Sequence, residues 1–542
     1  MRIDTLFTNG RIRTLDPDRP TANAIGVLNG RIIGLDEEVE GAIPDRIIDL
    51  RGRPVLPGFH DAHNHLSLTG ARLAAIDLRP TIVRSLDALY LAVEEYASEH
   101  PDEKWIRGSG YDQNLLGGHP TAEGLDRASG GRAVIIEHVS GHMIVASTKA
   151  FELAGYADRR DVPDVDGGGI PRDTDGRALG LLQEQATQLI NRLVRPVPLD
   201  EVQRNIELAS RQALSYGLTS VTEPGIGATD MLGNSPVDFH SYQTAIEDGV
   251  LGVRVTLMPF MSTLHDIDRM PEWLGLDLGF RTGFGDDFLR IGPVKVASDG
   301  SFIGRSAAMH RCYLGEADNV GVLIHEPDRL EDFIVRAHAS GWTVATHAIG
   351  DRAADHVLDA IEVAQRRHPR PDVRHRIEHF ALADDDRVRR AAALGVIPVP
   401  QAAFLSAFGD GMAAAVDPAL RDQIYRVKSL ADAGIVLNGS SDSPVSDANP
   451  LTGIRDMVLR RTGSGELIGP DERISVEDAV RAYTYGSAYA VGEEAEKGTL
   501  EAGKLADFAV LTEDLFEIPP ERITDQRAVA TVVGGEVRHG EL

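Results

Sequence analysis

Four short segments of this chain end an apolar run with histidine or aspartate, the side chains that most often hold a metal ion. The segments are Leu56–His65, Thr343–His347, Arg374–His379 and Val436–Asp442. Imidazole nitrogens and carboxylate oxygens are common protein ligands of zinc and similar divalent ions. Each segment is unspecific alone, but together they predict one metal site built from the ends of several strands, and therefore an enzyme.

The first of these segments contains a His-x-His pair. His63 and His65 are two residues apart, so on a strand both side chains point to the same side. In a chain with 18 histidines this spacing also arises by chance, and the competing interpretation is a pair of structural or surface histidines. Their position after the apolar run Val55–Phe59, at an expected strand end, favours metal ligands.

His347 and His379 each end a strand-like run, and Asp442 follows another. A lone buried histidine is more often a hydrogen-bonded core residue, and an aspartate before Ser443-Pro444 often stabilises a turn. The repetition favours ligands instead, because barrel enzymes draw their site residues from several strand ends. At the end of the last strand, Asp442 is expected to bind metal and also to accept the proton of the attacking water.

A fifth apolar run, Ile291–Ala297, carries Lys295 in its middle. A lysine inside such a strand is unfavourable unless it is paired, and burial lowers its pKa. One interpretation is a salt-bridged lysine, or one whose ammonium group reaches solvent. The other is a neutral amine that takes up carbon dioxide and forms a carbamate able to bridge two metal ions. The spacing alone leaves both open.

These residues need elements to position them. Strand-like runs that alternate with amphipathic helical stretches predict an α/β protein with a parallel sheet. We expect eight barrel strands, near residues 54–59, 219–223, 253–260, 291–297, 342–346, 374–378, 396–399 and 435–438. The segment at about 70–212 is expected to be an insertion over the barrel mouth. Residues 1–54 and 495–542 are rich in strand patterns, with a hairpin signal at Asn29-Gly30, and predict one β domain around a barrel domain at 55–494.

The composition excludes several classes of protein. A net charge of -28 argues against nucleic-acid binding, because a polyanion would be repelled over most of the surface. There is no apolar stretch long enough for a membrane span, no secretory signal pattern at the start, and a single cysteine, Cys312, which cannot form an internal disulfide. We therefore expect a cytoplasmic enzyme acting on a small molecule, with a homodimer as the default assembly.

The motifs resemble the amidohydrolase superfamily and, within it, the amidohydrolase-3, YtcJ-like branch. The resemblance covers nearly the whole chain and is carried by Leu56–His65, Lys295–Ser301, Thr346–Asp351, Arg376–His379, Ser441–Pro444, Gly503–Asp507 and, in the insertion, Ser140–Ser147 and Gly180–Glu184. It implies a (β/α)8 TIM barrel, a discontinuous urease-like β-sandwich formed by both termini, and a large insertion after the first barrel strand. It also implies one or two divalent metal ions, zinc in the first place, held by His63, His65, Lys295, His347, His379 and Asp442. The superfamily pattern favours a carboxylated Lys295.

The resemblance implies hydrolysis of an amide-type C–N bond, such as that of an N-formyl or N-acyl amine, by metal-activated water. His142, Glu184 and Arg305 are candidates for substrate binding, although each is equally compatible with a structural role. Three alternatives stay open. One is a deaminase of the same superfamily, with Glu378 beside His379 as its acid. The others are a lactone or carbamate hydrolase, and a barrel that binds without catalysis.

Overall fold

The computed structural model describes residues 1–79, 82–139, 143–165, 168–229 and 232–542, which fall into two compact units. The first unit comprises Met1–Leu66 and Ala209–Leu542, and the second comprises Ser67–Leu208. Helix α7 (Leu199–Ser215) runs across the division between them. Within the described ranges, no helix is long and apolar enough to cross a membrane.

Two four-stranded parallel sheets, here called the parallel sheets, form the centre of the first unit. The strand order of one is β19-β16-β15-β8, with β8 (Phe59–Asp61), β15 (Leu218–Ile226), β16 (Arg254–Pro259) and β19 (Leu289–Ile291). The order of the other is β20-β21-β22-β23, with β20 (Val294–Ala297), β21 (Val344–Ala348), β22 (Arg376–His379) and β23 (Ile397–Val399). An isolated bridge pairs Phe260, just after β16, with Lys295 of β20. Every residue of β15 and β22 is buried, as expected for parallel strands covered on both faces.

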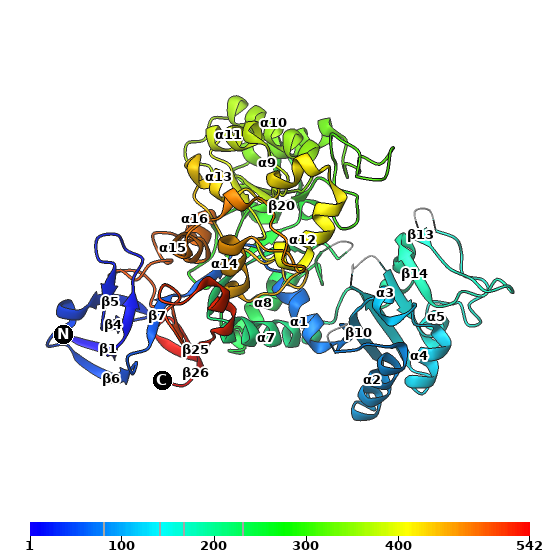
Figure 1. Cartoon of the computed structure of the whole chain (residues 1–542), viewed down its shortest axis with the longest axis horizontal. Coiled ribbons are helices and arrows are strands. Elements are labelled where there is room, and N and C mark those ends of the chain that lie inside the picture. Colours follow the sequence, from blue (N-terminus) through cyan, green and yellow to red (C-terminus); the bar gives the residue numbers. More distant parts are fainter. Residues whose placement is uncertain (80–81, 140–142, 166–167, 230–231) are drawn as a thin grey trace. The chain divides into compact units, whose positions relative to one another are not determined.

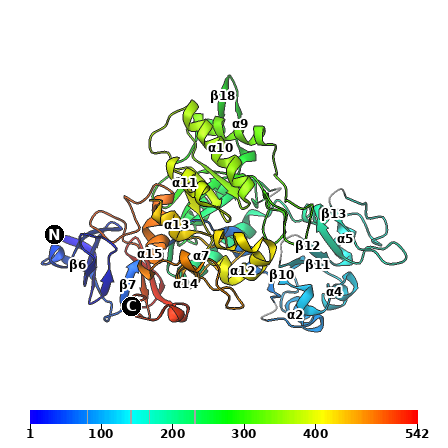
Figure 2. The same cartoon turned by 45° about the horizontal axis from the view of Figure 1, so that its top comes forward.

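Helices follow the parallel strands along the chain. They are α8 (Asp238–Glu247), α9 (Pro327–Ala339), α10 (Asp351–Arg367), α11 (Asp385–Ala393), α12 (Phe404–Ala415), α13 (Val427–Asp432), α14 (Pro450–Leu459), α15 (Val476–Arg481) and α16 (Ser487–Ala490). Helices α9, α10 and α11 lie together (Figures 1 and 2), and α9 and α10 contact β21. In α10, Ala353, Val357, Ile361 and Ala364 recur at helical spacing and share a buried core with Val344 of β21.

Three predicted strands differ in the structure. The run at 54–59 divides at Gly58: β7 (Pro54–Pro57) joins a different sheet, and only β8 joins a parallel one. A Cβ at Gly58 would lie 2.2 Å from Thr219 Oγ1, so the chain can change sheets there only with glycine. The run at 291–297 is interrupted between β19 and β20 at Pro293, which has no N–H to donate. Residues 435–438 form no regular strand.

Both ends of the chain build two further sheets of the first unit, the terminal sheets. One has the order β5-β4-β1-β6, with β1 (Arg2–Thr8), β4 (Ile25–Leu28), β5 (Arg31–Leu35) and β6 (Ile43–Asp49). The other has the order β26-β25-β24-β7-β2-β3, with β2 (Arg11–Arg13), β3 (Thr21–Ala22), β24 (Phe508–Leu511), β25 (Ala528–Val533) and β26 (Glu536–Gly540). N-terminal strands (blue) therefore lie beside C-terminal strands (red) in Figure 1.

The terminal sheets share one apolar core, which includes Phe7, Val55 and Phe508. The rings of Phe7 and Phe508 meet edge to face, with centroids 4.9 Å apart. The hairpin predicted at Asn29-Gly30 is confirmed, since these two residues join the paired strands β4 and β5. Their φ values of 52° and 75° are both in the left-handed region that a two-residue type I′ turn requires.

The second unit has a six-stranded mixed sheet of its own. Its order is β13-β14-β12-β11-β10-β9, with β9 (Ile76–Asp77), β10 (Trp105–Tyr111), β11 (Ala133–His138), β12 (Met143–Ala146), β13 (Gly168–Gly169) and β14 (Leu181–Glu184). Its helices are α1 (Leu66–Ala74), which begins at the division, α2 (Leu86–Glu99), α3 (Gln113–Leu116), α4 (Ala122–Ala128), α5 (Thr148–Leu153) and α6 (Gln188–Asn191). Apolar clusters pack against this sheet, so the unit has its own core.

Candidate metal centre

Three of the predicted ligands meet in one buried cluster. A donor atom from each of His63, His65 and Asp442 lies within 4.8 Å of the other two. Asp442 Oδ1 is 3.2 Å from His63 Nε2 and 3.3 Å from His65 Nε2. His63 Nε2 is buried and makes no well-aligned hydrogen bond to any described residue. Two imidazoles and a carboxylate are donors that a divalent ion commonly binds, and His63 Nε2 is left free to bind one. These three residues therefore fit a metal ion.

Backbone hydrogen bonds bring the two segments of the cluster together. The Asp442 N–H donates to His63 O (2.7 Å), and the His65 N–H donates to Ser443 O (2.8 Å). The buried carboxylate of Asp61 reinforces this pairing by accepting from the Ser441 N–H (3.0 Å) and the Ser441 hydroxyl (2.5 Å). Pairing at alternate residues directs His63 and His65 to one side, as expected from their spacing.

A second layer of polar residues holds His63. Its Nδ1 contacts Glu378 Oε2, and both side chains are buried. Arg376 Nε donates to Glu378 Oε1 and Arg376 Nη2 donates to Glu378 Oε2, both at 2.8 Å. Burial alone would raise the pKa of Glu378, but the charge of Arg376 and the contact with His63 hold it far below its usual value. Glu378 is therefore an ionised acceptor in the interior.

Lys295 is buried on β20, and its charge interacts with those of Glu378 and Asp442. Burial lowers the pKa of Lys295 to about 8, although the two carboxylates oppose that change. An amine with this pKa is partly neutral near physiological pH, which is the form that reacts with carbon dioxide.

His379 and His347 lie beside the cluster. The His379 ring centroid is 5.3 Å from that of His63 and 4.5 Å from that of His347. His379 Nδ1 lies 2.6 Å from Gln401 Oε1, and the Gln401 amide donates to Val399 O (2.8 Å). The amide group of Gln401 is thereby oriented with its oxygen toward His379, so His379 Nδ1 is the donor and Nε2 keeps its lone pair.

His347 uses its other nitrogen in the same way. His347 Nε2 lies 2.9 Å from Gly300 O, a pure acceptor, so Nε2 carries the hydrogen and Nδ1 keeps the lone pair. Asp299 Oδ1, 3.3 Å from Nε2, favours the same tautomer. Both histidines therefore present an unprotonated nitrogen, the form in which imidazole binds metal.

The charges in the cluster suit metal binding. Burial lowers the pKa of His65 and of His379, so both are neutral near pH 7. Burial alone would raise the pKa of Asp442, but the nearby imidazoles of His63 and His65 hold it well below its usual value. Asp442 is thus an ionised carboxylate beside the neutral rings of His65 and His379.

The backbone departs from regular geometry at two of these residues. The φ values of His379 (72°) and Asp442 (57°) lie in the left-handed region that residues other than glycine rarely adopt. Such strain is found where the surrounding structure fixes functional side chains. At His379 it ends β22 and lets neighbouring residues Glu378 and His379 both approach His63.

Of the three predicted substrate-binding residues, the structure describes Glu184 and Arg305, which belong to different units. His142 lies outside the described residues. Glu184 ends β14 in the second unit with an exposed side chain. Arg305, in the first unit, forms an ion pair with Glu316 at 2.6 Å and donates to Leu314 O at 3.1 Å.

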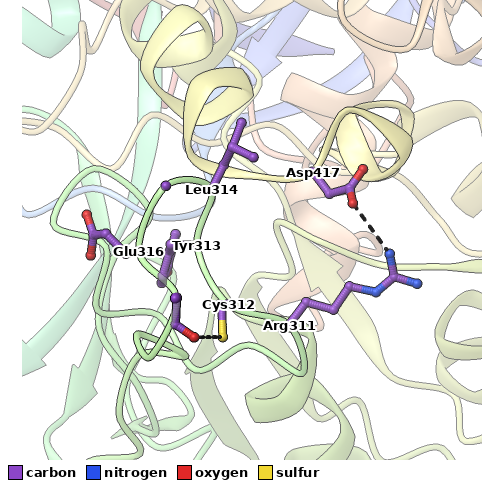
Figure 3. A pocket seen from close by; sticks show the side chains of 8 residues that line it. Arg311, Cys312, Tyr313, Leu314, Glu316 and Asp417 are labelled. Atoms are coloured by element: carbon purple, nitrogen blue, oxygen red, sulfur yellow. Dashed lines mark hydrogen bonds and ion pairs between the residues drawn. The ribbon is translucent and has the colours of Figure 1, made fainter.

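A surface pocket of about 380 Å³ lies in the first unit (Figure 3). It is lined by Asp417 and residues 311–317, including Arg311, Cys312 and Glu316. Arg311 faces Asp417 across it at 3.8 Å, and the Cys312 thiol donates to Ala317 O at 3.0 Å. Since no predicted ligand lines it, this pocket is separate from the cluster of His63, His65 and Asp442.

Three residues that support the cluster were not identified from the sequence. Asp61 and Gln401 are ordinary polar residues whose partners lie far away in the chain, and nothing local marks them. Arg376 carried a weak signal, because it stands two residues before Glu378 on the same predicted strand and so faces the same side.

The chain is similar to known proteins over nearly its whole length. The model of the amidohydrolase family matches residues 46–539. Protein LONG AFTER FAR-RED 3 of Arabidopsis thaliana is 32% identical, over 98% of this chain and 91% of its own. The putative amidohydrolase YtcJ of Bacillus subtilis is 29% identical, over 98% of both chains. The N-substituted formamide deformylase of Arthrobacter pascens is also 29% identical, over 99% of this chain and 98% of its own.

A solved structure has a similar fold. The crystal structure of an uncharacterized metal-dependent hydrolase from Pyrococcus furiosus has a TM-score of 0.77 at 28% sequence identity, covering 95% of this chain and 100% of the other. The motifs at the strand ends, the family match and these relatives agree. The chain belongs to the amidohydrolase family, in its YtcJ-like branch.

Proposed function

We propose that this protein is a metal-dependent hydrolase that cleaves an amide-type C–N bond, with N-formyl or N-acyl amines as the first substrates to test. The observation that carries the proposal is the buried cluster of His63, His65 and Asp442. Within it, His63 Nε2 makes no well-aligned hydrogen bond to any described residue. The similarity to an N-substituted formamide deformylase supports the choice of substrate class.

The architecture proposed for this function is a (β/α)8 barrel. The two parallel sheets would supply seven of its strand positions, with β19 and β20 sharing the fourth, and residues 435–438 would complete it beside β8. The bridge between Asn64 and Ser443 supports closure at that side. We propose domain bounds of 55–494 for the barrel, with its insertion at about 70–212, and 1–54 with 495–542 for the terminal β domain.

Six residues would hold the metal: His63, His65, Lys295, His347, His379 and Asp442. We propose zinc, with one ion if Lys295 is a free amine and two if it is a carbamate. When bound, a divalent ion supplies Lewis-acid chemistry, which polarises the substrate carbonyl and makes water acidic enough to attack near pH 7.

The protein's own part in the reaction is proton transfer and orientation. The ionised Asp442 would accept the proton of the water that attacks the carbonyl carbon. The same carboxyl group would then deliver that proton to the nitrogen, so that the C–N bond breaks and a neutral amine leaves. The other product is a carboxylic or formic acid, which loses its remaining proton to solvent. His142, Glu184 and Arg305 remain the proposed substrate contacts.

The deaminase alternative loses support from the position of Glu378. Its two oxygens are occupied by Arg376 and His63, and its pKa is held far below its usual value. An ionised carboxylate with both oxygens engaged is a poor acid for a leaving amine. The lactone or carbamate hydrolase alternative involves the same cluster and is separated only by substrate.

The test joins metal content to a substrate screen. Protein produced with zinc and bicarbonate is analysed for metal per chain, then stripped with a chelator and reloaded. N-alkylformamides, N-acyl amines, lactones and aminated rings are assayed in each state for acid, amine and ammonia. Formate and amine release that disappears on stripping and returns with zinc supports the proposal. Absence of bound metal in every state would refute it.

A further inference from the structure

A closed ring of contacts joins Ala62 and His63, which directly follow β8, to Arg376 and Glu378 of β22. His63 Nδ1 contacts Glu378, and Glu378 accepts two hydrogen bonds from Arg376. Arg376 Nη2 also donates to Ala62 O at 2.7 Å, and Ala62 is the residue bonded to His63. This closed ring of contacts therefore fixes the plane of the His63 imidazole relative to its own backbone and to β22.

The ring also fixes the tautomer of His63. Both oxygens of Glu378 accept hydrogen bonds from Arg376, so Glu378 is the acceptor in this pair and His63 Nδ1 is the donor. The lone pair is then on His63 Nε2, the atom that faces Asp442 at 3.2 Å. A carboxylate behind a histidine is a common way to orient a metal ligand and to raise its basicity.

The competing explanation is that Arg376 and Glu378 are simply an ion pair that stabilises the fold. Buried ion pairs contribute little net stability, because desolvation offsets the attraction. In addition, Arg376 Nη1 is buried without a hydrogen-bond partner among the described residues, which is unfavourable. A pair kept for stability alone does not account for this arrangement against a predicted ligand.

The same molecule contains a matched pair for comparison. Arg254 and Asp507 are also buried and bidentate, with Nε to Oδ2 at 2.7 Å and Nη2 to Oδ1 at 3.0 Å. That pair joins a parallel sheet to the C-terminal part of the chain and contacts none of the six predicted ligands. It therefore serves as a control for the effect of losing a buried ion pair that contacts no predicted metal ligand.

We propose that Glu378 and Arg376 are positioning residues that hold His63 in the tautomer and orientation needed to bind a metal ion. Glu378 acts directly on His63 Nδ1, and Arg376 acts by donating to both oxygens of Glu378 and to Ala62 O, which holds the carboxylate in place. Neither residue touches the substrate. The inference rests on the proposed function, since it requires His63 to be a metal ligand.

Zinc affinity of the full-length, metal-stripped chain tests this proposal, measured by competition with a chromophoric chelator. Glu378→Gln keeps the size of the side chain and removes its charge. We expect zinc binding to weaken about 10- to 100-fold, the usual effect of losing such a partner. The control is Asp507→Asn, which should lower Tm and leave zinc affinity within about 3-fold of wild type. Arg376→Lys, which keeps charge but not the bidentate contact, should fall between them.

The outcomes separate the two proposals. If wild-type protein binds no zinc, the proposed function fails first. If wild type binds zinc and Glu378→Gln binds it equally well, the positioning role is wrong. Equal weakening in Asp507→Asn would also overturn it, because the effect would then be general destabilisation.

A measurement on the wild-type protein needs no folded variant. Nitrogen NMR of metal-free protein with labelled histidine should show His63 protonated at Nδ1, with its signals assigned by their loss in His63→Asn. An Nε2-protonated His63 would overturn the proposal.

Discussion

The parallel sheets and the terminal sheets belong to the same unit but differ in where their charged side chains lie. The core of the terminal sheets is apolar, with Phe7 and Phe508 at its centre, and ion pairs such as that between Arg46 and Glu536 stay at the surface. The ends of the parallel strands instead bury charged and titratable residues, among them Lys295 and Glu378. Since burying a charge is unfavourable unless it is paired, the difference makes the ends of the parallel strands the candidate functional region.

The largest effect should come from changing one buried carboxylate at the parallel sheets. Asp442→Asn keeps the shape of the side chain but cannot accept the proton, so kcat on the best substrate of the screen should fall about 10³- to 10⁴-fold. Asp507→Asn, a carboxylate outside the cluster, should leave kcat near wild type. A near-normal rate in Asp442→Asn would show that its proposed role as proton acceptor is wrong.

The terminal sheets should respond in the reverse way. Phe508→Ala removes a fully buried ring that packs on Phe7, and the cavity should lower the free energy of unfolding by about 4 kcal/mol. Denaturant titration measures this change, and zinc affinity of the folded protein should stay the same. A loss of zinc affinity without loss of stability would contradict the separation of the two regions.

Lys295→Met should raise stability while it lowers metal content. Burial lowers the pKa of Lys295 from 10.5 to about 8, so the unfolded chain binds this proton more tightly than the folded one. The resulting cost, about 3 kcal/mol at about 1.4 kcal/mol per pH unit, is fully present below pH 8 and disappears between pH 8 and 10.5. Metal-free Lys295→Met should therefore be more stable than wild type at pH 7, with the difference shrinking above pH 8.

Zinc and bicarbonate should reverse this order, because binding stabilises only the folded protein that holds the metal. Chemical denaturation with and without zinc checks both statements. Equal metal content in the two proteins would exclude Lys295 as a ligand.

The smallest effect concerns a buried histidine pair outside the cluster, His338 of α9 and His375, which directly precedes β22. His375 Nδ1 accepts from the Val344 N–H at 3.1 Å, His375 Nε2 lies 2.8 Å from His338 Nδ1, and His338 Nε2 donates to His368 O. Burial lowers the pKa of His375 well below its usual value, and the nearby His338 and Arg370 lower it further.

The unfolded chain therefore binds a proton at His375 that the folded chain does not, and stability falls as pH drops below 6.5. We expect a loss of about 1 kcal/mol from this residue between pH 6.5 and 5.5, visible as a smaller pH dependence of unfolding in His375→Leu. Identical pH profiles for the two proteins would contradict this.

The sequence predicted which residues would meet better than it predicted how they are supported. His63 and His65 could be paired with Asp442 because carboxyl ends of parallel strands converge, whatever the details of the strands. The role of Glu378 could not be seen, since strict alternation would direct neighbouring residues Glu378 and His379 to opposite faces. The left-handed backbone at His379 breaks that alternation, and the residues around it give no sequence pattern that predicts this conformation.

The remaining differences also have local causes that depend on distant residues. The change of sheet at Gly58 is imposed by the close approach of Thr219, and Gln401 matters only because His379 reaches it. Both are contacts between segments that no short pattern connects. The sheet order of the second unit was likewise beyond reach, because strand patterns do not specify which strands pair.

The hydrogen bonds between Asp61 and Ser441 also join two segments that are synthesised at different times. These residues are 380 positions apart, so one side of the metal centre leaves the ribosome long before the other. At ordinary rates of synthesis the interval is roughly 20 to 75 s. During that time His63 and His65 have no Asp442 beside them, and a captured ion would be held by an incomplete set of ligands. Under the proposed function, complete loading with metal therefore follows the synthesis of Asp442, late in biosynthesis.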